Sequence, residues 1–256
     1  MTAYERRQSI LESLRRNPGM RVVALAEVFD VSEGTIRNDL DALEGEGRLA
    51  RVHGGAVLKD GWSLDNTSFT DRHKENVEQK EMIGRKAAGS IQDGDSILLD
   101  ASSTAYYLGL ALESKSRLRV VTNGLDVARL MAKNPTNTVI LIGGILNADG
   151  SSVTGLFSEM LIEELRIQKA FVSCSGFSIA RGMTEVHLQE ALLKRKVIES
   201  AGEVIALVDS SKFGKEDLTP FASVDQICCL FTDKGISKEW EHKLVQSNIN
   251  INICHD

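Results

Sequence analysis

Five short segments combine hydroxyl, amide, carboxylate and glycine groups of the kind that bind small charged ligands. They are residues 100–104 (Asp-Ala-Ser-Ser-Thr), 122–124 (Thr-Asn-Gly), 143–144 (Gly-Gly), 173–176 (Ser-Cys-Ser-Gly) and 209–214 (Asp-Ser-Ser-Lys-Phe-Gly). Hydroxyl residues at the start of a helix can hold a phosphate group, because backbone N–H groups and the helix dipole point at it. Any one segment could simply cap a helix or form a turn. Five in succession, each after an apolar run, predict a site for a phosphorylated ligand.

Three charged side chains could complete such a site. Glu190 and Lys194 are four residues apart, so they share one face of any helix that contains them. The spacing alone favours an exposed ion pair worth roughly a few tenths of a kcal/mol. The alternative is that Lys194 turns inward and supplies positive charge to an anionic ligand, with Lys212 as a second candidate cation. A sugar phosphate needs cations and N–H donors for its phosphate, and carboxylates and amides for its hydroxyls.

The five segments follow apolar runs that are typical of buried strands. Strands are predicted at residues 97–99, 119–122, 139–142, 170–173, 204–208 and 227–231, with a further one at 249–253. Helix-length stretches lie between most of them, for example 104–112, 125–132 and 188–201. This alternation indicates an α/β domain with a Rossmann-like, mostly parallel sheet that helices cover on both faces. Ligands bind at the carboxyl ends of such strands, where the five segments fall.

The first sixty residues have a different pattern, in which three amphipathic helices precede a hairpin. Helices are predicted at residues 5–14, 22–29 and 33–46, and Ser32 is the expected N-cap of the third because its hydroxyl can accept a backbone hydrogen bond. Two short apolar runs on either side of residues 53–55 predict a hairpin. This order is that of a winged helix-turn-helix, whose third helix and wing contact DNA. The alternative is a generic helical domain with a solvated charged face.

The candidate DNA contacts lie on the third helix and the wing. They are Ser32, Thr35, Arg37, Asn38, Arg51, His53 and Gly54. Residues 1–59 hold nine Lys/Arg and nine Asp/Glu, and the rest of the chain holds twenty-one and twenty-seven, which gives the net charge of −6. A neutral unit can still bind DNA if its basic groups share a face.

The predicted domain boundaries follow from a polar stretch after the hairpin. Residues 59–70 contain Gly, Ser, Asn and Asp with few apolar residues, which is typical of a linker. Helical character resumes near residue 72 and continues to 91. We therefore predict a DNA-binding domain at 1–58, a linker at 59–74 and an effector-sensing α/β domain at 75–256.

Composition predicts a cytoplasmic protein with a packed core. Hydrophobic residues make up 42% and charged residues 26% of the chain, as in ordinary globular proteins. No apolar run approaches the roughly 18 residues of a membrane span, and residues 1–16 lack the apolar centre of a signal peptide. The four cysteines (Cys174, Cys228, Cys229 and Cys254) form no C-x-x-C pair, so we expect free thiols in a reducing compartment. We expect no metal, no cofactor and no membrane partner.

Residues 31–56, VSEGTIRNDLDALEGEGRLARVHGGA, closely resemble the DNA-binding signature of the DeoR family of bacterial transcription regulators. The resemblance implies that double-stranded operator DNA is a partner. Family members commonly carry a second arginine directly after the position of Arg37, whereas this chain has Asn38. Asparagine can pair with adenine in the major groove, so the resemblance also implies a different operator preference.

The resemblance covers nearly the whole chain. It continues at residues 93–100 with Ser103-Thr104, at 121–123, at Gly143-Gly144 with Gly155, at Ser175-Gly176, at Glu190 with Lys194 and at 209–214. It implies a C-terminal domain similar to ribose-5-phosphate isomerase that binds a phosphorylated sugar or related metabolite, and a homo-oligomer, either dimer or tetramer. Binding of the metabolite would release a repressor of a carbohydrate-metabolism operon from its operator. The implied effector residues are Asp100, Ser102, Ser103, Thr104, Thr122, Asn123, Gly176, Glu190, Lys194, Asp209 and Lys212. Ala101 departs from the glycine or serine that relatives often carry, which could reshape the loop beside the phosphate.

Two other functions compete with this hypothesis. The first is a sugar-phosphate isomerase-like enzyme, which would need a carboxylate base over the substrate carbon. Residues 145–148, after the paired glycines, are Ile-Leu-Asn-Ala rather than acidic and basic, and the chain has no Walker loop, nucleophile motif or metal-ligand cluster. The second is a DNA-binding protein without a ligand, which the size and polar strand ends of the second domain disfavour.

Overall fold

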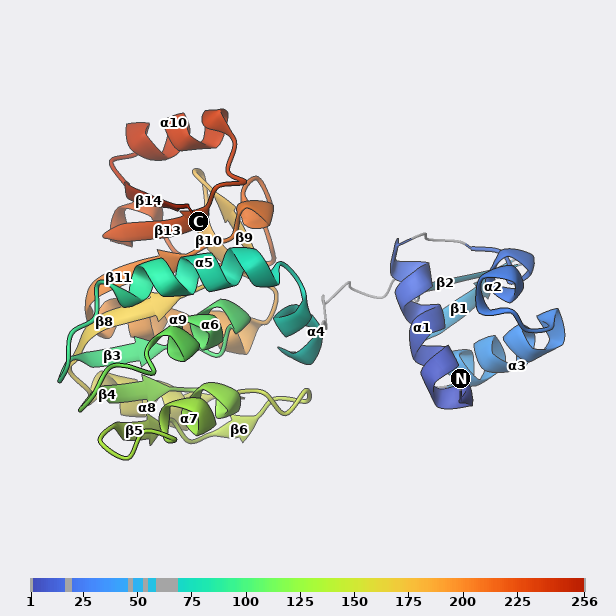
Figure 1. Cartoon of the computed structure of the whole chain (residues 1–256), viewed down its shortest axis with the longest axis horizontal. Helices are drawn as coiled ribbons and strands as arrows, with labels where there is room; N and C mark the ends of the chain where they lie inside the picture. The colour runs from blue at the N-terminus through green and yellow to red at the C-terminus, as the bar shows by residue number, and fades with distance from the viewer. Residues whose placement is uncertain (1, 17–19, 46–47, 53–54, 59–68, 256) are drawn as a thin grey trace. The chain divides into compact units, whose positions relative to one another are not determined.

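A computed structural model describes residues 2–16, 20–45, 48–52, 55–58 and 69–255. The chain divides into two compact units, residues 1–64 and 65–256. The predicted linker covers residues 59–74. Its first ten residues lie outside the described part of the chain, but Phe69–Lys74 forms helix α4, which belongs to the larger unit (Figure 1).

The smaller unit is a winged helix-turn-helix, as the sequence predicts. Its elements are α1 (Ala3–Arg16), α2 (Val22–Phe29), α3 (Glu33–Gly45) and the antiparallel strands β1 (Leu49–Val52) and β2 (Gly55–Leu58). The turn between α2 and α3 is tight because Asp30 adopts a left-handed conformation, with φ of 51°. Ser32 Oγ then accepts a hydrogen bond from Thr35 N at 3.1 Å, which caps α3.

One apolar cluster holds the smaller unit together. The predicted inward positions of α3, Ile36, Leu40 and Leu43, are all completely buried. The same helix buries one carboxylate, Asp39, which accepts hydrogen bonds from Arg6 Nε at 2.6 Å and Arg7 Nε at 3.0 Å. Because α1 supplies both cations, these two ion pairs fix the orientation of α3 against α1.

The larger unit is built on a seven-stranded parallel sheet with the order β14-β13-β11-β8-β3-β4-β5. Its strands are β3 (Ser96–Leu99), β4 (Arg119–Thr122), β5 (Thr138–Leu141), β8 (Ile167–Val172), β11 (Ala201–Leu207), β13 (Cys229–Asp233) and β14 (Asn250–Cys254). All seven predicted strands are present, and every neighbouring pair runs parallel. The predicted α/β fold with a mostly parallel sheet is confirmed.

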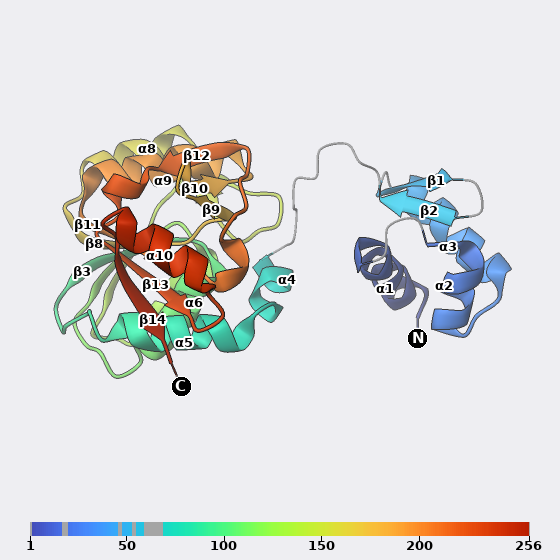
Figure 2. The ribbon, with the colours of Figure 1, turned by 90° about the horizontal axis from the view of Figure 1, so that it is seen from above.

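Helices cover both faces of this sheet, since successive strand residues point to opposite sides. Leu99 faces α5 (Val77–Ala88), α6 (Ser103–Ala111) and α7 (Leu125–Met131), whereas Leu98 faces α8 (Leu156–Glu163), α9 (Leu188–Ser200) and α10 (Lys238–Gln246). Figure 2 shows α5 and α6 on one side of the sheet and α8 and α9 on the other.

The structure differs from the predicted elements in two places. The helix predicted over 72–91 is broken into α4 and α5, because Asn76 adopts a left-handed conformation with φ of 50°. Short antiparallel strands also occur where none is predicted. They are the hairpin β6 (Ile145–Leu146) and β7 (Val153–Thr154), and a small sheet of β9 (Gly176–Ser178), β10 (Gly182–Glu185) and β12 (Thr219–Ala222). Such short strands have too few residues for a periodic pattern.

We predict that Gly84→Ala destabilises the larger unit. A Cβ atom on Gly84 would lie 2.7 Å from backbone atoms of Tyr107 and Leu108, because α5 crosses α6 at this point. The overpacking cost of about 1–3 kcal/mol should exceed the helix propensity that alanine gains, roughly 1 kcal/mol. Urea unfolding followed by circular dichroism measures the difference. Gly143→Ala is the control, since a Cβ there has no atom within 4 Å, and equal stabilities of the two variants would contradict the prediction.

Candidate functional site

The predicted effector residues gather at one edge of the large sheet. Strands β11, β8, β3 and β4 are consecutive neighbours and parallel, so their carboxyl ends lie side by side (Figure 1). Residues 209–212, 173–176, 100–104 and 122–123 directly follow these four ends. The segment 143–144 follows β5, the next strand along. The sheet topology thus brings the five polar segments to the same edge.

Lys194 is the centre of this edge. Its side chain is turned inward and buried, and Nζ donates to Ser173 O at 2.8 Å and to Glu185 Oε2 at 2.7 Å. Asp100 Oδ2 lies 3.1 Å from the same nitrogen. The exposed Glu190–Lys194 pair that the spacing favoured is therefore wrong, because both side chains are buried and Lys194 pairs with other carboxylates.

The three charges of this cluster stabilise one another. Burial alone would lower the pKa of Lys194, but the carboxylates of Glu185 and Asp100 raise it above its ordinary value. Burial alone would likewise raise the pKa of Glu185, which Lys194 instead lowers. Asp100 is held further by the N–H groups of Ser102, at 3.1 Å, and Ser173, at 2.9 Å. The cluster is a fully engaged ion triad rather than a free cation awaiting a ligand.

Glu190 has a different set of partners. Its carboxylate accepts hydrogen bonds from Asn147 Nδ2 at 2.8 Å, Ser152 Oγ at 2.6 Å and Asn123 Nδ2 at 3.3 Å. Burial raises the pKa of Glu190. Because Asn147 and Ser152 lie in the turn that joins β6 to β7, Glu190 ties that hairpin to α9.

The start of α6 offers donors that the protein does not use. Ser102 caps the helix, with its Oγ accepting from Ala105 N at 3.1 Å. The backbone N–H groups and hydroxyls of Ser103 and Thr104 make no hydrogen bond to the described residues. Thr122 Oγ1 accepts a hydrogen bond from Gly124 N at 3.0 Å, which closes the turn after β4. Ser103 and Thr104 therefore combine hydroxyls and backbone N–H groups without a described partner at one helix start, which suits an anion.

A second group of polar residues surrounds Asp209. Its Oδ1 accepts from Ser211 N at 3.1 Å and from Asn76 Nδ2 at 3.3 Å, but its Oδ2 is buried without a partner among the described residues. Burial lowers the pKa of Lys80 to about 8, while the nearby Asp209 acts to raise it. Lys212 lies in the 3-10 turn that Asp209 caps, and its ammonium makes no ion pair with any described residue.

Packing holds the 209–214 loop against the sheet. Phe213 lies between Phe177, at 5.4 Å between ring centroids, and Trp240 of α10, at 5.3 Å. A Cβ on Gly176 would lie 2.6 Å from Lys215 O, so this position must be glycine for the loop to approach β9. Gly176 therefore allows the 209–214 loop to lie close to this edge of the sheet.

Helix α4 is attached to the same edge. Phe69 N donates to Asp149 Oδ2 at 3.3 Å, and Lys80 Nζ donates to the carbonyls of Arg72 and Glu75 at 2.5 and 2.6 Å. His73 also stacks on Tyr107 of α6, with ring centroids 4.9 Å apart. Neither Lys80 nor Asn76 was among the predicted site residues, because a helix predicted without a break gives no reason for either to face the strand ends.

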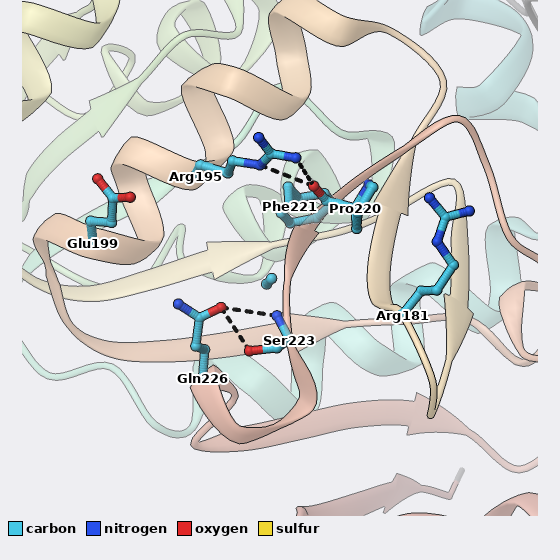
Figure 3. A pocket seen from close by; sticks show the side chains of 8 residues that line it. Arg181, Arg195, Glu199, Pro220, Phe221, Ser223 and Gln226 are labelled. Carbon is cyan, nitrogen blue, oxygen red and sulfur yellow. Dashed lines mark hydrogen bonds between the residues drawn. The ribbon is translucent and has the colours of Figure 1, made fainter.

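A surface pocket of about 260 Å³ lies behind Phe221, whose ring centroid is 5.1 Å from Lys194 Nζ (Figure 3). Its lining residues include none of the predicted effector residues. Arg195 donates through Nε and Nη2 to Pro220 O at 3.0 and 2.5 Å, and Arg181 donates to Asp217 O at 3.5 Å. Both guanidinium groups already have oxygen partners, so the pocket offers less to an anion than the strand ends do.

In the smaller unit the predicted DNA contacts lie at the surface of α3. Thr35 is partly buried by its hydrogen bond to Ser32, while Arg37 and Asn38 are exposed. Arg37 Nη2 lies 2.6 Å from Glu33 Oε2, and Arg51 of β1 pairs with Asp41. His53 and Gly54 fall outside the described residues. Acidic partners on α3 thus hold both arginines in the absence of DNA.

Comparison with known proteins assigns both units. A DeoR-like helix-turn-helix domain matches residues 6–61, and a DeoR C terminal sensor domain matches residues 75–234. The chain belongs to the DeoR family. It is 36% identical to the HTH-type transcriptional regulator GolR of Listeria innocua, over 99% of this chain and 100% of that protein. It is therefore a DNA-binding transcription regulator, as the sequence predicts.

Two further DeoR relatives are repressors by name. The Lactose phosphotransferase system repressor of Streptococcus mutans is 33% identical over 91% of this chain and 93% of its own. The Glycerol-3-phosphate regulon repressor of Escherichia coli is 30% identical over 99% and 100%. A D-ribose-5-phosphate isomerase structure with phospho-erythronic acid aligns over 54% of each chain with 17% identity and a TM-score of 0.40, a likeness too small to support any conclusion on function.

Two properties of the described residues bear on other classes of protein. No helix among them has the length and apolar character needed to cross a membrane. Their His, Cys, Asp and Glu side chains include no group of three or more that could hold a metal ion.

We predict that Lys194→Met destabilises this DeoR regulator by about 3–5 kcal/mol, because it leaves the buried carboxylates of Asp100 and Glu185 unpaired. Urea unfolding measures the loss. Lys196→Met is the matched control, since its partner Glu163 is exposed and such pairs contribute at most about 1 kcal/mol. A Lys194→Met variant as stable as the control would show that the triad does not support the fold.

We predict that Arg37→Ala weakens operator binding by roughly 1–3 kcal/mol if the guanidinium reads a base. Fluorescence anisotropy with an operator duplex selected in vitro measures this loss. Arg85→Ala removes a comparable exposed i,i+4 pair, with Glu81, from α5 and should not change DNA affinity. Unchanged binding by Arg37→Ala would remove this residue from the recognition surface.

Proposed function

We propose that this DeoR-family protein is a cytoplasmic repressor of a carbohydrate-metabolism operon, and that a small phosphorylated sugar or related metabolite releases it from its operator. The metabolite binds at the carboxyl ends of β3, β4, β8 and β11. The names of the lactose and glycerol-3-phosphate repressors support this class of target and ligand. The protein acts without a cofactor or catalytic step, as a dimer or larger assembly.

The proposal rests on one observation. At one edge of the sheet, the described residues include hydrogen-bond donors without a partner, a lysine without an ion pair and a carboxylate oxygen without a hydrogen bond. The N–H groups and hydroxyls of Ser103 and Thr104 suit a phosphate at the start of α6. Lys212 supplies positive charge without first breaking an ion pair. The free Oδ2 of Asp209 suits a ligand hydroxyl.

The same contacts argue against an enzyme. Asp100 and Glu185 are both paired with Lys194, and Glu190 accepts three hydrogen bonds from Asn147, Ser152 and Asn123. None of these three carboxylates is free to take a proton from a substrate carbon. Release from DNA instead follows when the ligand binds one conformation better than the DNA-bound one, which shifts the population between them.

The test is a thermal-shift screen with glycerol 3-phosphate and six-carbon sugar phosphates, each beside its unphosphorylated parent. A ligand at about 100 times its dissociation constant stabilises the folded state by about 2.7 kcal/mol. Stabilisation by a phosphate but not by its parent supports the proposal. If no phosphate in the panel stabilises the protein or releases it from operator DNA, DNA binding stands and the proposed ligand class is wrong.

We predict that Lys212→Met weakens binding of the phosphorylated ligand while operator affinity without ligand stays unchanged, because Lys212 makes no ion pair with the residues that the structure describes. Loss of a charge-assisted hydrogen bond should cost about 1.5–3 kcal/mol. Ligand titration of the protein–operator complex measures this cost. Lys215→Met, an exposed lysine of the same loop, is the control. Normal release of Lys212→Met would exclude it from the site.

A further inference from the structure

Helix α8 is apolar on both of its faces. Ser158 and Ile162 are completely buried against the sheet, as expected for one face of a surface helix. The opposite face carries Leu156, Phe157 and Met160, which are 68%, 75% and 55% exposed. The outer face of a surface helix normally carries polar and charged residues, whereas Leu156, Phe157 and Met160 of α8 are covered by no described residue over most of their surface.

The neighbouring strand β6 extends this apolar surface. Ile145 and Leu146 of β6 are 71% and 55% exposed. A Cβ on Gly155, directly before α8, would lie 3.6 Å from Ile145 Cδ1. Figure 1 shows β5, β6 and α8 together at the end of the sheet opposite β14. We call this surface the α8–β6 patch: Ile145, Leu146, Leu156, Phe157 and Met160.

Two strands at this end of the molecule have a free edge. Among the described residues, β5 pairs with β4 alone and β6 pairs with β7 alone. Free strand edges are normally protected by charged residues or by a covering element, because they can pair with another chain. On β6, the exposed apolar side chains of Ile145 and Leu146 lie at this edge.

We propose that the α8–β6 patch is the surface through which two copies of this chain associate around a two-fold axis. Its five side chains expose roughly 500–600 Å² of apolar surface, which is at the upper end of the range for the largest patch of a monomer, and patches of this size commonly mark interaction sites. Each partner in a standard stable interface buries about 800 Å². A two-fold arrangement lets the same patch cover itself.

The charge of the patch selects a second copy over other partners. Residues 141–160 contain no Lys or Arg, and their acidic residues are Asp149 and Glu159. A nucleic acid or an anionic membrane surface would need basic residues there. Two identical chains of net charge −6 can meet at this surface because it brings few like charges together. A winged helix-turn-helix that reads repeated half-sites also needs a pair of chains.

Hydrogen bonds connect the α8–β6 patch to the candidate effector site. The β6–β7 hairpin that carries Ile145 and Leu146 is bonded through Asn147 and Ser152 to Glu190. The dimer contact would therefore lie on the outer side of the element that Glu190 holds. The association itself does not depend on which ligand, if any, the site binds.

Sedimentation velocity of the full chain at micromolar concentration tests the proposal. The wild type should sediment as a dimer or larger assembly, and Phe157→Glu should raise the dissociation constant at least about tenfold, since it places a charge at the centre of an apolar interface. Val245→Glu is the matched control, because Val245 on α10 is 58% exposed and lies outside the patch. Melting temperatures of all variants check folding, and Leu146→Asp on β6 is the second variant if Phe157→Glu melts early.

Dissociation by Phe157→Glu or Leu146→Asp, with the Val245→Glu variant still assembled, supports the proposal. A wild type that is monomeric at these concentrations overturns it and leaves the patch to a different protein. A wild-type assembly that survives both patch substitutions also overturns it, because the copies must then associate through another surface. Loss of ligand response without a change in sedimentation would concern the effector site alone.

Discussion

The buried ammonium of Lys194 holds the edge of the large sheet together. It joins α9 to the ends of β3, β8 and β10, through Asp100, Ser173 O and Glu185. A lone charge in this position would be very costly, because burial removes its hydration. Two carboxylates and a carbonyl replace that hydration, so the side chains of the triad are fixed relative to one another.

This arrangement divides the polar groups of the edge into two sets. The first set forms ion pairs and hydrogen bonds within the protein and acts as a rigid frame. It consists of Lys194, Asp100, Glu185 and Glu190. The second set keeps hydrogen-bonding capacity or charge that no described residue uses. It consists of Ser103, Thr104, Lys212 and the buried Oδ2 of Asp209. Asn76 touches this second set through Asp209 while it also forms the break between α4 and α5. Asn76, which lies between α4 and α5, is therefore hydrogen-bonded to this edge of the sheet.

The DNA-binding unit contains two kinds of ion pair. Arg37 and Arg51 are paired with the carboxylates of Glu33 and Asp41 on α3, which are 43% and 60% exposed. Pairs with such exposed carboxylates are weak, so DNA phosphates can replace the carboxylates. Arg6 and Arg7 are paired with Asp39, which is only 3% exposed, and hold α3 in place. The burial of the carboxylate thus separates the pairs that DNA can replace from those that orient the helix.

The amino-acid sequence by itself determined the order of the elements and the identity of both domains. The apolar spacing of Ile36, Leu40 and Leu43 is enough to define α3, and continuous apolar runs such as 204–208 are enough to define buried parallel strands. It also placed Asp100, Asp209 and Lys212 at strand ends, since each directly follows such a run. These features depend on neighbours in the chain, so local patterns encode them.

Only the tertiary structure decided which side chains meet. The spacing of Glu190 and Lys194 favoured an exposed pair with each other. In the folded protein, Lys194 instead forms ion pairs with Asp100 and Glu185. Glu190 accepts hydrogen bonds from Asn147 and Ser152. Glu185 gave no signal because β10 is too short to show a period. Asn76 and Lys80 were not predicted as site residues because the helix predicted over 72–91 had no break, whereas Asn76 adopts φ of 50° between α4 and α5. Partners that are far apart in the chain are chosen by packing and desolvation, and neither is visible in the order of residues.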